Sequence, residues 1–417
     1  MTQHVFIIGT VWPEPASSAA GSRLLQLIDV FQKNAWIISF ASAAQKGEHA
    51  FHLENLQITT YQIKLNDSEF DELIKNIKPS IVVFDRFISE EQYGWRITEH
   101  CTNALKILDT IDLHCLRNER HLALKQNRTF QWNDLLTNEL AKREIASIYR
   151  CDISLMISEV EMDILKNIFK IDSALLHYCG FMYPTISESD QMNWPSFKER
   201  KNFLSIGNFL HEPNWDAVLY LKNEIWPAIR KQLPQAELQI YGAYSSQKVL
   251  QLHQVKEGFL IKGRAMEVGL VMKQALVCLA PLRFGAGIKG KLADSMLYGT
   301  PNVTSSIGSE SMHGSLPWNG FICDEASDFI EKSVELYRNE KLWCESQKNG
   351  IAIINQYFEN KNAAKKLSDK IVAAKEDLDN HRTNNFIGNL LQQHQFASSK
   401  FMSLWIEAKN KTLDSTS

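Results

Sequence analysis

The chain has 417 residues, of which 44% are apolar and 22% are charged, and its formal net charge is −3. This composition is ordinary for globular proteins and excludes disordered and collagen-like classes. The charge argues against a dedicated nucleic-acid-binding protein, whose domain would be strongly basic. One hydrophobic core stops growing at about 250 to 300 residues, so we expect two domains.

In the first half of the chain, short apolar runs alternate with longer helical patterns, which is typical of a parallel sheet wrapped by helices. Residues 4–9 (HVFIIG) predict the first strand, and residues 22–31 predict the helix after it, with Ser22 as a plausible cap. Further strands are expected at residues 35–40, 56–63, 80–85, 104–109 and 152–158. Helices are expected at residues 70–78 and 134–150. These elements predict a doubly wound domain over residues 1–183.

Residues 184–200 are polar, contain two prolines and show no sustained period, so we expect them to be a linker. The alternation then restarts over residues 201–350. Strands are expected there at residues 202–208, 238–242, 259–263, 276–281, 302–306 and 320–324. Residues 351–417 read as helices only, and we expect them to pack back toward the first domain. The predicted fold is therefore α/β, with two Rossmann-like domains facing across a cleft and a helical C-terminus.

The seven cysteines are odd in number and form no close pair, so they predict neither a disulfide framework nor a zinc site. The N-terminus lacks the basic region of a signal peptide, and no apolar stretch approaches the roughly 18 residues of a membrane span. We expect a cytoplasmic protein that binds no nucleic acid. The mildly basic residues 117–150 could face the inner surface of a membrane, although an ordinary solvated helix has the same pattern.

Residues 283–291 (RFGAGIKGK) combine an arginine, three glycines and two lysines directly after an expected strand. We expect this loop to end at a helix N-terminus, where unpaired N–H groups and the helix dipole favour an anion. Lys289 and Lys291 add charges suited to phosphate, and Asp294 lies three residues further on, where it can accept hydrogen bonds from sugar hydroxyls. Three glycines would let the backbone approach a ligand: Gly285, Gly287 and Gly290. A tight turn with solvated lysines is the alternative interpretation.

Two familiar nucleotide-binding patterns are missing from the sequence. The loop at residues 283–291 does not match the G-x-x-x-x-G-K-[ST] pattern of nucleoside triphosphatases. The first predicted strand does not lead into G-x-G-x-x-G, because residues 9–21 lack that spacing. A dinucleotide-dependent dehydrogenase is therefore disfavoured.

Residues 203–312 resemble the donor-binding half of family 4 glycosyltransferases with the GT-B fold, the glycosyl transferases group 1. The likeness is most specific at GAGIKGKLADSM and the YGTP that follows it. The first half resembles the acceptor domain of the same family at residues 9–23 and 109–120. The resemblance implies transfer of a sugar from a nucleotide diphosphate sugar to a hydroxyl of a glycan or lipid-linked glycan. It also implies retention at the anomeric carbon, with no metal or other cofactor.

The resemblance also implies roles for individual residues. It assigns catalysis to His114, Lys289 and Lys291. It assigns donor binding to Gly21, Asn208, Gly263, Arg264, Arg283, Gly285, Ala286, Gly287, Asp294 and Glu310. It assigns acceptor binding to Arg23, Asp112 and Arg117. From the residues alone, Gly21 could equally belong to a helix cap, Arg117 and Arg120 to a solvated helix face, and Glu310 to a solvated loop.

The chain departs from the family pattern at four positions. Ala286 stands where the family has a glutamate that touches the sugar, and Asp294 stands where it has a ribose-binding glutamate. Where many members carry an arginine and a lysine, this chain has Asn208 and His211. The departures keep open a nucleotide-sugar epimerase or phosphorylase on the same fold and a non-catalytic nucleotide-sugar-binding protein. They leave the donor sugar, the base, the acceptor, the linkage and the oligomeric state undetermined.

Overall fold

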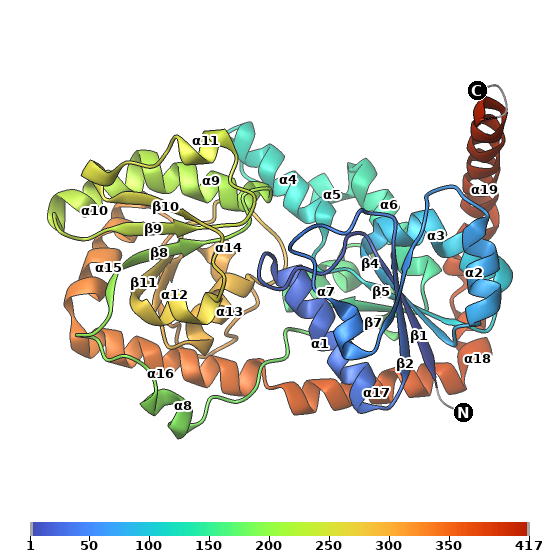
Figure 1. Cartoon of the computed structure of the whole chain (residues 1–417), viewed down its shortest axis with the longest axis horizontal. Helices are drawn as coiled ribbons and strands as arrows, with labels where there is room; N and C mark the ends of the chain where they lie inside the picture. The colour runs from blue at the N-terminus through green and yellow to red at the C-terminus, as the bar shows by residue number, and fades with distance from the viewer. Residues whose placement is uncertain (1–2, 415–417) are drawn as a thin grey trace.

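Two parallel β-sheets organise the computed structural model (Figure 1). It describes residues 3–414, without the side chains of residues 394–397 and 412–414. The first sheet has the order β3-β2-β1-β4-β5-β6-β7. Its strands are β1 (His4–Gly9), β2 (Ile37–Ser42), β3 (Thr59–Gln62), β4 (Ile81–Asp85), β5 (Leu105–Asp109), β6 (Ile153–Met156) and β7 (Leu176–Tyr178).

The second sheet has the order β10-β9-β8-β11-β12-β13, and in both sheets all neighbouring strands are parallel. Its strands are β8 (Lys201–Ile206), β9 (Leu238–Tyr241), β10 (Phe259–Gly263), β11 (Ala275–Ala280), β12 (Asn302–Thr304) and β13 (Gly320–Ile322). The predicted fold class is confirmed. In each sheet the winding reverses between the first and fourth strands of the domain, and ligands of such sheets bind at the carboxyl ends of the strands near this point.

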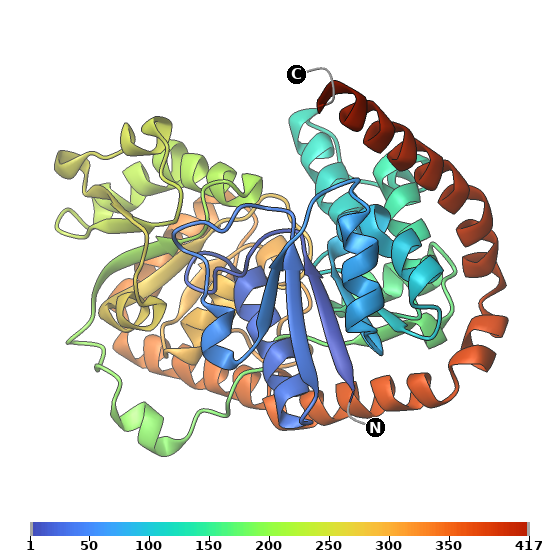
Figure 2. The same cartoon turned by 45° about the vertical axis from the view of Figure 1, so that its right-hand side comes forward.

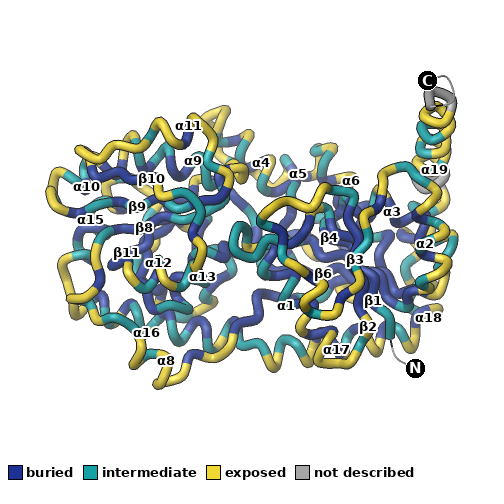
Figure 3. The backbone as a smooth tube through the Cα atoms, viewed as in Figure 1, coloured by how far each residue is buried: buried dark blue, intermediate teal, exposed yellow. Residues whose placement is uncertain are grey.

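Helices cover both faces of each sheet, so the central strands are buried on both sides (Figure 3). The first domain contains α1 (Ala19–Lys33), η1 (Leu53–Leu56), α2 (Glu69–Ile77), α3 (Arg86–His100), α4 (His114–Lys125), α5 (Asn133–Thr137), α6 (Glu139–Arg150), α7 (Glu159–Asn167) and η2 (Ser173–Leu175). Burial on both faces explains why β1, β4 and β5 read as continuous apolar runs.

The connection to the second domain contains α8 (Glu188–Met192). The second domain contains α9 (Glu212–Tyr220), η3 (Leu221–Ile225), α10 (Trp226–Gln232), α11 (Gln247–Leu250), η4 (Val255–Glu257), α12 (Val268–Gln274), α13 (Gly290–Leu297), α14 (Ser306–Ser309) and α15 (Ala326–Arg338). The chain ends in α16 (Glu340–Tyr357), α17 (Asn360–Glu376), α18 (Leu378–Asn384) and α19 (Phe386–Asp414).

Two predicted helices differ from those in the structure because polar caps decide where a helix begins. The first helix starts at Ala19 and not at residue 22, since the Ser18 side chain accepts a hydrogen bond from the Gly21 N–H at 3.1 Å. Ser22 is therefore not the cap. The helix predicted over residues 134–150 is divided into α5 and α6, because Asn138 caps α6 by accepting from the Ala141 N–H.

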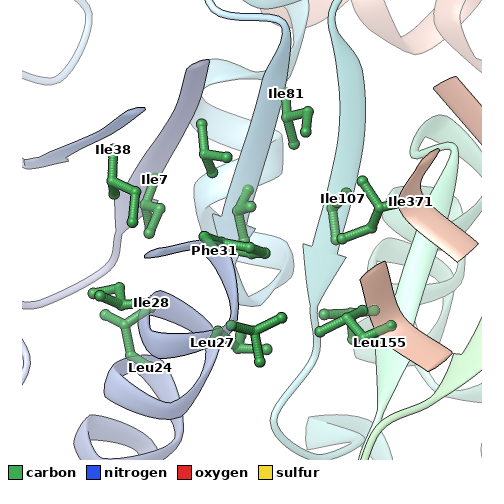
Figure 4. Close-up of a cluster of buried hydrophobic side chains, with 14 of the residues drawn as sticks. Ile7, Leu24, Leu27, Ile28, Phe31, Ile38, Ile81, Ile107, Leu155 and Ile371 are labelled. Carbon is green, nitrogen blue, oxygen red and sulfur yellow. The ribbon is translucent and has the colours of Figure 1, made fainter. Parts of the chain in front are cut away.

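The C-terminal helices run from the second domain back to the first, as Figures 1 and 2 show along the lower edge of the molecule. The domain boundary predicted at residue 350 lies inside α16. Ile353 and Ile354 belong to a buried cluster with Leu292 and Met296 of α13, so α16 packs against the second domain until it ends at Tyr357. In α17, Leu367 and Ile371 enter the core of the first domain. Figure 4 shows Ile371 against Ile107 and Leu155 of the first sheet.

No helix within residues 3–414 combines the length and the apolar character needed to cross a membrane.

The packing of α17 predicts that the first domain depends on the end of the chain for stability. Ile371 is 1% exposed, whereas Val372 beside it is 42% exposed. Replacing a buried Ile with Ala costs about 2 to 5 kcal/mol through lost transfer energy and the cavity left behind. We therefore expect Ile371→Ala to lower the free energy of unfolding by that amount in urea titrations. Val372→Ala is the matched control and should change it by less than about 0.5 kcal/mol; equal effects would contradict this packing.

Candidate functional site

A cavity of about 570 Å³ lies between the carboxyl ends of the two sheets. Residues within two positions of the ends of β1, β4, β8 and β11 contribute to its wall: Thr10, Arg86, Gly207 and Leu282. This is the position expected for a ligand of doubly wound sheets. Nine of the predicted site residues line it: Asp112, His114, Arg117, Asn208, Gly285, Ala286, Lys289, Lys291 and Asp294.

The glycine-rich loop leads into α13 at the cavity wall. The helix begins at Gly290 after the cap residue Lys289, with no side-chain cap and no acidic residue in its first turn. Its first backbone N–H groups therefore have no acceptor from a capping side chain, and they carry the positive end of the helix dipole. Gly290 and Lys291 both line the cavity. This end of α13 can bind an anion.

Two lysines border this helix end, and both are held by neutral oxygen atoms. Lys289 Nζ donates to the Gly287 carbonyl at 2.7 Å, and Lys291 Nζ donates to Asn214 Oδ1 at 2.7 Å. Burial lowers the pKa of each ammonium group to about 8. Both are therefore mainly charged at neutral pH, in a poorly solvated place where an anionic oxygen would be a stronger partner than an amide.

Asp294 lies one helical turn further along α13 and also lines the cavity. The Tyr183 hydroxyl group donates a hydrogen bond to it, and burial raises the pKa of its carboxyl group to about 7. Removing this group from water therefore costs stability when it is charged. A ligand hydroxyl could donate to the carboxylate and offset that cost.

On the opposite wall, His114 is the first residue of α4, the helix that begins beyond the end of β5. Its Nε2 atom lies 3.2 Å from Asp112 Oδ1, and Arg117 also bonds to Asp112. These contacts hold the pKa of Asp112 well below its usual range, against the effect of burial. The structure thus brings together His114, Asp112 and Arg117 as one charged group.

Two buried carboxyl groups, which the sequence did not reveal as part of the site, hold the start of α4. Glu144 of α6 accepts from the backbone N–H groups of His114 and Cys115, each at 3.0 Å. Glu161 of α7 accepts from Leu113 N–H at 2.9 Å. Burial raises the pKa of Glu161 to about 8. Its only sequence signal is the S-x-x-E spacing from Ser158, which indicates a helix N-terminus and nothing about a site.

The same Glu161 oxygen also bonds to the second domain. Glu161 Oε1 accepts from Gly287 N–H at 2.8 Å. Gly287 has φ +64°, and a Cβ there would lie 2.8 Å from the Asp112 Cβ. At Gly290 a Cβ would lie 2.7 Å from the Ala19 Cβ. Gly287 does not line the cavity, and its lack of a Cβ lets the loop touch the first domain.

Two predicted residues of the first domain lie behind the cavity wall. Arg23 is fully buried, with Nε 2.9 Å from Asp109 Oδ1 and Nη1 2.7 Å from the Cys179 carbonyl. It cannot meet an acceptor, because its contacts are all inside the domain core. Gly21 lies in the first turn of α1, where a Cβ would lie 2.5 Å from the Glu14 backbone. Both residues therefore support structure, which corrects their assignment to ligand binding.

Two predicted donor contacts of the second domain also face other partners. Arg283 forms two hydrogen bonds with Asp216, at 2.9 and 2.5 Å, outside the cavity. Glu310 pairs with Arg120 through two bonds, at 2.8 and 2.7 Å. Arg120 is only 8% exposed. Arg120 is therefore not part of a solvated helix face, and Glu310 is not part of a solvated loop. Their pairing joins the two domains.

Gly263 and Arg264 lie beside the cavity and do not line it. Arg264 Nε donates to Ser17 Oγ of the first domain at 3.1 Å. Gly263 has φ +73°, and a Cβ there would meet nothing within 4 Å. Ala265, directly after them, does line the cavity.

Several polar residues that line the cavity were not predicted, among them Arg86, His211 and Asn214. His211 stands where a cation was expected. Burial between the domains and the charge of Arg117 lower its pKa to about 4, so it is neutral at pH 7. Within the described residues, no group of three or more His, Cys, Asp or Glu is placed to hold a metal ion.

The raised pKa of Asp294 predicts a pH-dependent cost to folding. Folding raises this pKa from 3.8 to about 7, so the folded state binds more protons than the unfolded chain between these values. The contribution of Asp294 to the free energy of unfolding therefore falls as the pH rises through this window. We expect Asp294→Asn to raise the free energy of unfolding at pH 8 by roughly 1 to 3 kcal/mol, and by less at pH 4.

Urea unfolding of both proteins at the two pH values measures this difference. Asp369→Asn, at an exposed position of α17, is the matched control and should show no such pH dependence. An equal effect of Asp294→Asn at both pH values would contradict the proposed burial cost.

Comparisons with known proteins agree with this arrangement. Residues 200–339 match the sequence profile of the family glycosyl transferases group 1. Sucrose-phosphate synthase from Thermosynechococcus elongatus has a similar structure, with a TM-score of 0.65 and 15% identity over 89% of this chain and 100% of that chain. Anabaena HepE in complex with UDP and glucose has a TM-score of 0.64 and 12% identity, over 88% and 99%.

The lipopolysaccharide outer core galactosyltransferase WaaB has a TM-score of 0.56 and 14% identity, over 89% of this chain and 99% of that chain. No curated protein sequence matches the chain. At these identities the structural likenesses establish the fold alone. The match to glycosyl transferases group 1 thus covers the second domain, and the structural likenesses along most of the chain show the same two-domain fold.

Proposed function

We propose that the protein transfers a sugar from a uridine diphosphate sugar to a hydroxyl of a glycan or lipid-linked glycan, with retention at the anomeric carbon and without a metal. The observation that carries this proposal is the convergence of Lys289, Lys291 and the open end of α13 on one cavity, with Asp294 beside them. The cavity volume of about 570 Å³ is usual for small-molecule sites, which range from about 300 to 1,000 Å³.

The lysines and the α13 N-terminus would stabilise the leaving diphosphate. Charge develops on the departing phosphate oxygen as the bond to the sugar breaks, and preorganised donors in a dry site stabilise such charge strongly. Lys289 is buried, Lys291 is half-buried, and hydrogen bonds hold both in place, so they need little reorganisation. This role replaces the one assigned to Arg283, whose charge is used by Asp216.

The remaining groups suggest how the acceptor attacks. Among the described residues that line the cavity, the carboxyl groups belong to Asp112 and Asp294. Asp112 is used by His114 and Arg117, and Asp294 lies on the α13 side. Asp112 is thus already paired, and we assign Asp294 to the donor, so neither is assigned as a nucleophile. We therefore propose attack from the face that the diphosphate leaves, with the diphosphate taking the proton and His114 contacting the transferred sugar.

Different observations support the proposed base and the proposed sugar contacts. Similar folds bind UDP in HepE and in TarM from S. aureus, and this supports uridine as the base. We assign Asp294 to the ribose hydroxyl groups, because its carboxyl group lines the cavity beside the α13 N-terminus. Ala286 offers no side-chain contact to the sugar, so backbone groups of residues 285–288 would have to bind it.

Because Ala286 replaces the expected glutamate, two other functions are also considered. One is a nucleotide-sugar epimerase, and the other is a protein that binds a nucleotide sugar without transferring it. Product analysis with and without a glycan extract separates them. A changed sugar on the nucleotide without acceptor would indicate an epimerase. Tight nucleotide binding with no product in either case would indicate a binding protein.

We also propose a cytoplasmic location with peripheral contact at the inner face of a membrane. Trp132 and Leu136 are 46% and 52% exposed, and they lie near Lys125 and Arg128. Such a surface could meet anionic lipids and so reach a lipid-linked acceptor.

A panel of nucleotide diphosphate sugars tests the donor class. A ligand that binds only the folded protein raises the melting temperature by mass action. We expect UDP and at least one UDP-sugar to stabilise the protein more than the GDP, ADP or dTDP compounds. The measurement is a thermal shift at equal ligand concentrations. No stabilisation by any nucleotide would overturn the proposed function.

Lys291 provides the sharpest test of the site. Loss of one charged hydrogen bond costs about 1.5 to 3 kcal/mol, so Lys291→Met should weaken UDP affinity roughly 10- to 100-fold in calorimetry. Lys262→Met is the matched control, because this lysine is exposed on β10 and does not line the cavity. Full transferase activity and unchanged UDP affinity in Lys291→Met would sink the proposed role of the loop.

A further inference from the structure

Arg86 is a cation in the cavity wall that the proposed reaction has not used. It follows β4 directly and is the first residue of α3. In the sheet, β4 lies between β1 and β5. Arg86 lines the cavity together with Thr10 and Ile111, which follow those two strands. It therefore belongs to the wall made by the first domain, across from the loop that carries Lys289 and Lys291.

The backbone at Arg86 adopts a left-handed conformation that is unfavourable for arginine. Its φ is +67°, and a non-glycine residue in this region costs roughly 1 kcal/mol or more. Bonds on either side hold the turn: the Asp85 carbonyl accepts from Thr10 Oγ1 at 2.7 Å and from Ser89 Oγ at 2.9 Å. Asparagine or glycine would fit this turn with less strain, so the arginine side chain has to be explained by something other than the turn.

The Arg86 guanidinium group has no hydrogen bond to any described residue. Its ion pair with Asp85 Oδ2 is 3.8 Å long, and that oxygen already accepts from Thr10 N–H at 3.1 Å. Asp109, the other carboxylate that it interacts with, is paired with Arg23. The side chain is only 20% exposed. Its donors are thus largely removed from bulk water and open toward the cavity.

The other arginines near this wall each form hydrogen bonds to protein acceptors, although Arg23 Nη2 has none, and this sets Arg86 apart. Arg23 bonds to Asp109 and two backbone carbonyls, Arg117 bonds to Asp112, and Arg120 bonds to Glu310 and the Gly285 carbonyl. A partly buried guanidinium group without such partners needs an acceptor of matching shape. Carboxylate and phosphate groups match its planar pair of N–H donors.

We propose that Arg86 binds an oxyanion of the acceptor, so that the protein glycosylates a sugar or glycan that carries a carboxylate or a phosphate group. This inference rests on the proposed function, because it assumes that the second domain holds the donor. The donor diphosphate has its own cations at Lys289 and Lys291 and the end of α13. Arg86 lies on the first domain, so its charge is available for the other substrate.

The test uses three ligands that share one ring and differ at a single carbon: D-glucose, D-glucuronate and D-glucose 6-phosphate. Calorimetry measures their affinity in saturating UDP, so that the donor cations are already occupied. We expect at least one of the two anions to bind at least tenfold tighter than glucose. The anion that binds tighter indicates whether the natural group is a carboxylate or a phosphate.

Two variants assign that preference to Arg86. Arg86→Asn removes the charge and tolerates the left-handed backbone, so it should fold with a melting temperature at or above that of the native protein. We expect it to lose the anion preference and to bind UDP within twofold of the native value. Arg86→Lys should keep part of the preference. Arg338→Gln, at an exposed arginine of α15, is the matched control and should keep all of it.

Each other outcome overturns the inference. A native protein that binds UDP but neither anion better than glucose has no oxyanion subsite. A preference that survives in Arg86→Asn places the subsite on another residue. If Arg86→Asn weakens UDP binding as much as Lys291→Met, Arg86 serves the donor instead. Failure of the native protein to bind any nucleotide contradicts the proposed function itself, and that result is measured before any sugar is added.

Discussion

The close contact between the glycine-rich loop and the first domain is the constraint on which the site depends. Glu161 Oε1 accepts from Leu113 N–H and from Gly287 N–H, so one buried carboxyl group joins the start of α4 to the loop before α13. Arg120 adds a bond to the Gly285 carbonyl and a pair of bonds to Glu310. Without this approach, His114 and Lys289 would belong to two separate surfaces.

Removal of water from this contact sets the electrostatics of the cavity. Burial lowers the pKa of Lys289 and Lys291 and raises the pKa of Asp294 and Glu161. All four shifts disfavour the charged form, so the free protein holds these groups at a cost to its stability. A bound anion and its hydroxyl groups would offset that cost. Proteins commonly give up stability at functional sites in this way.

The C-terminal helices add a second connection between the domains. Ile353 and Ile354 of α16 pack in the second domain, while Leu367 and Ile371 of α17 pack in the first. Tyr183 N–H also donates to the Phe358 carbonyl, where the chain passes between the two. The relative position of the sheets therefore depends on residues far in sequence from the cavity. The sequence indicated that these helices would pack back, but not which side chains would enter which core.

The sequence by itself determined the two doubly wound domains, because alternating apolar runs and helical faces depend on neighbours only a few residues apart. It also indicated a loop suited to an anion, with Lys289 at its end and Lys291 and Asp294 in α13 after it. Only the tertiary structure decided which charges remain for a ligand. Arg23 and Asp109 are 86 residues apart, Arg283 and Asp216 are 67 apart, and Arg120 and Glu310 are 190 apart. A buried charge pairs with the partner that the fold brings to it, so local spacing could not separate these arginines from Arg86.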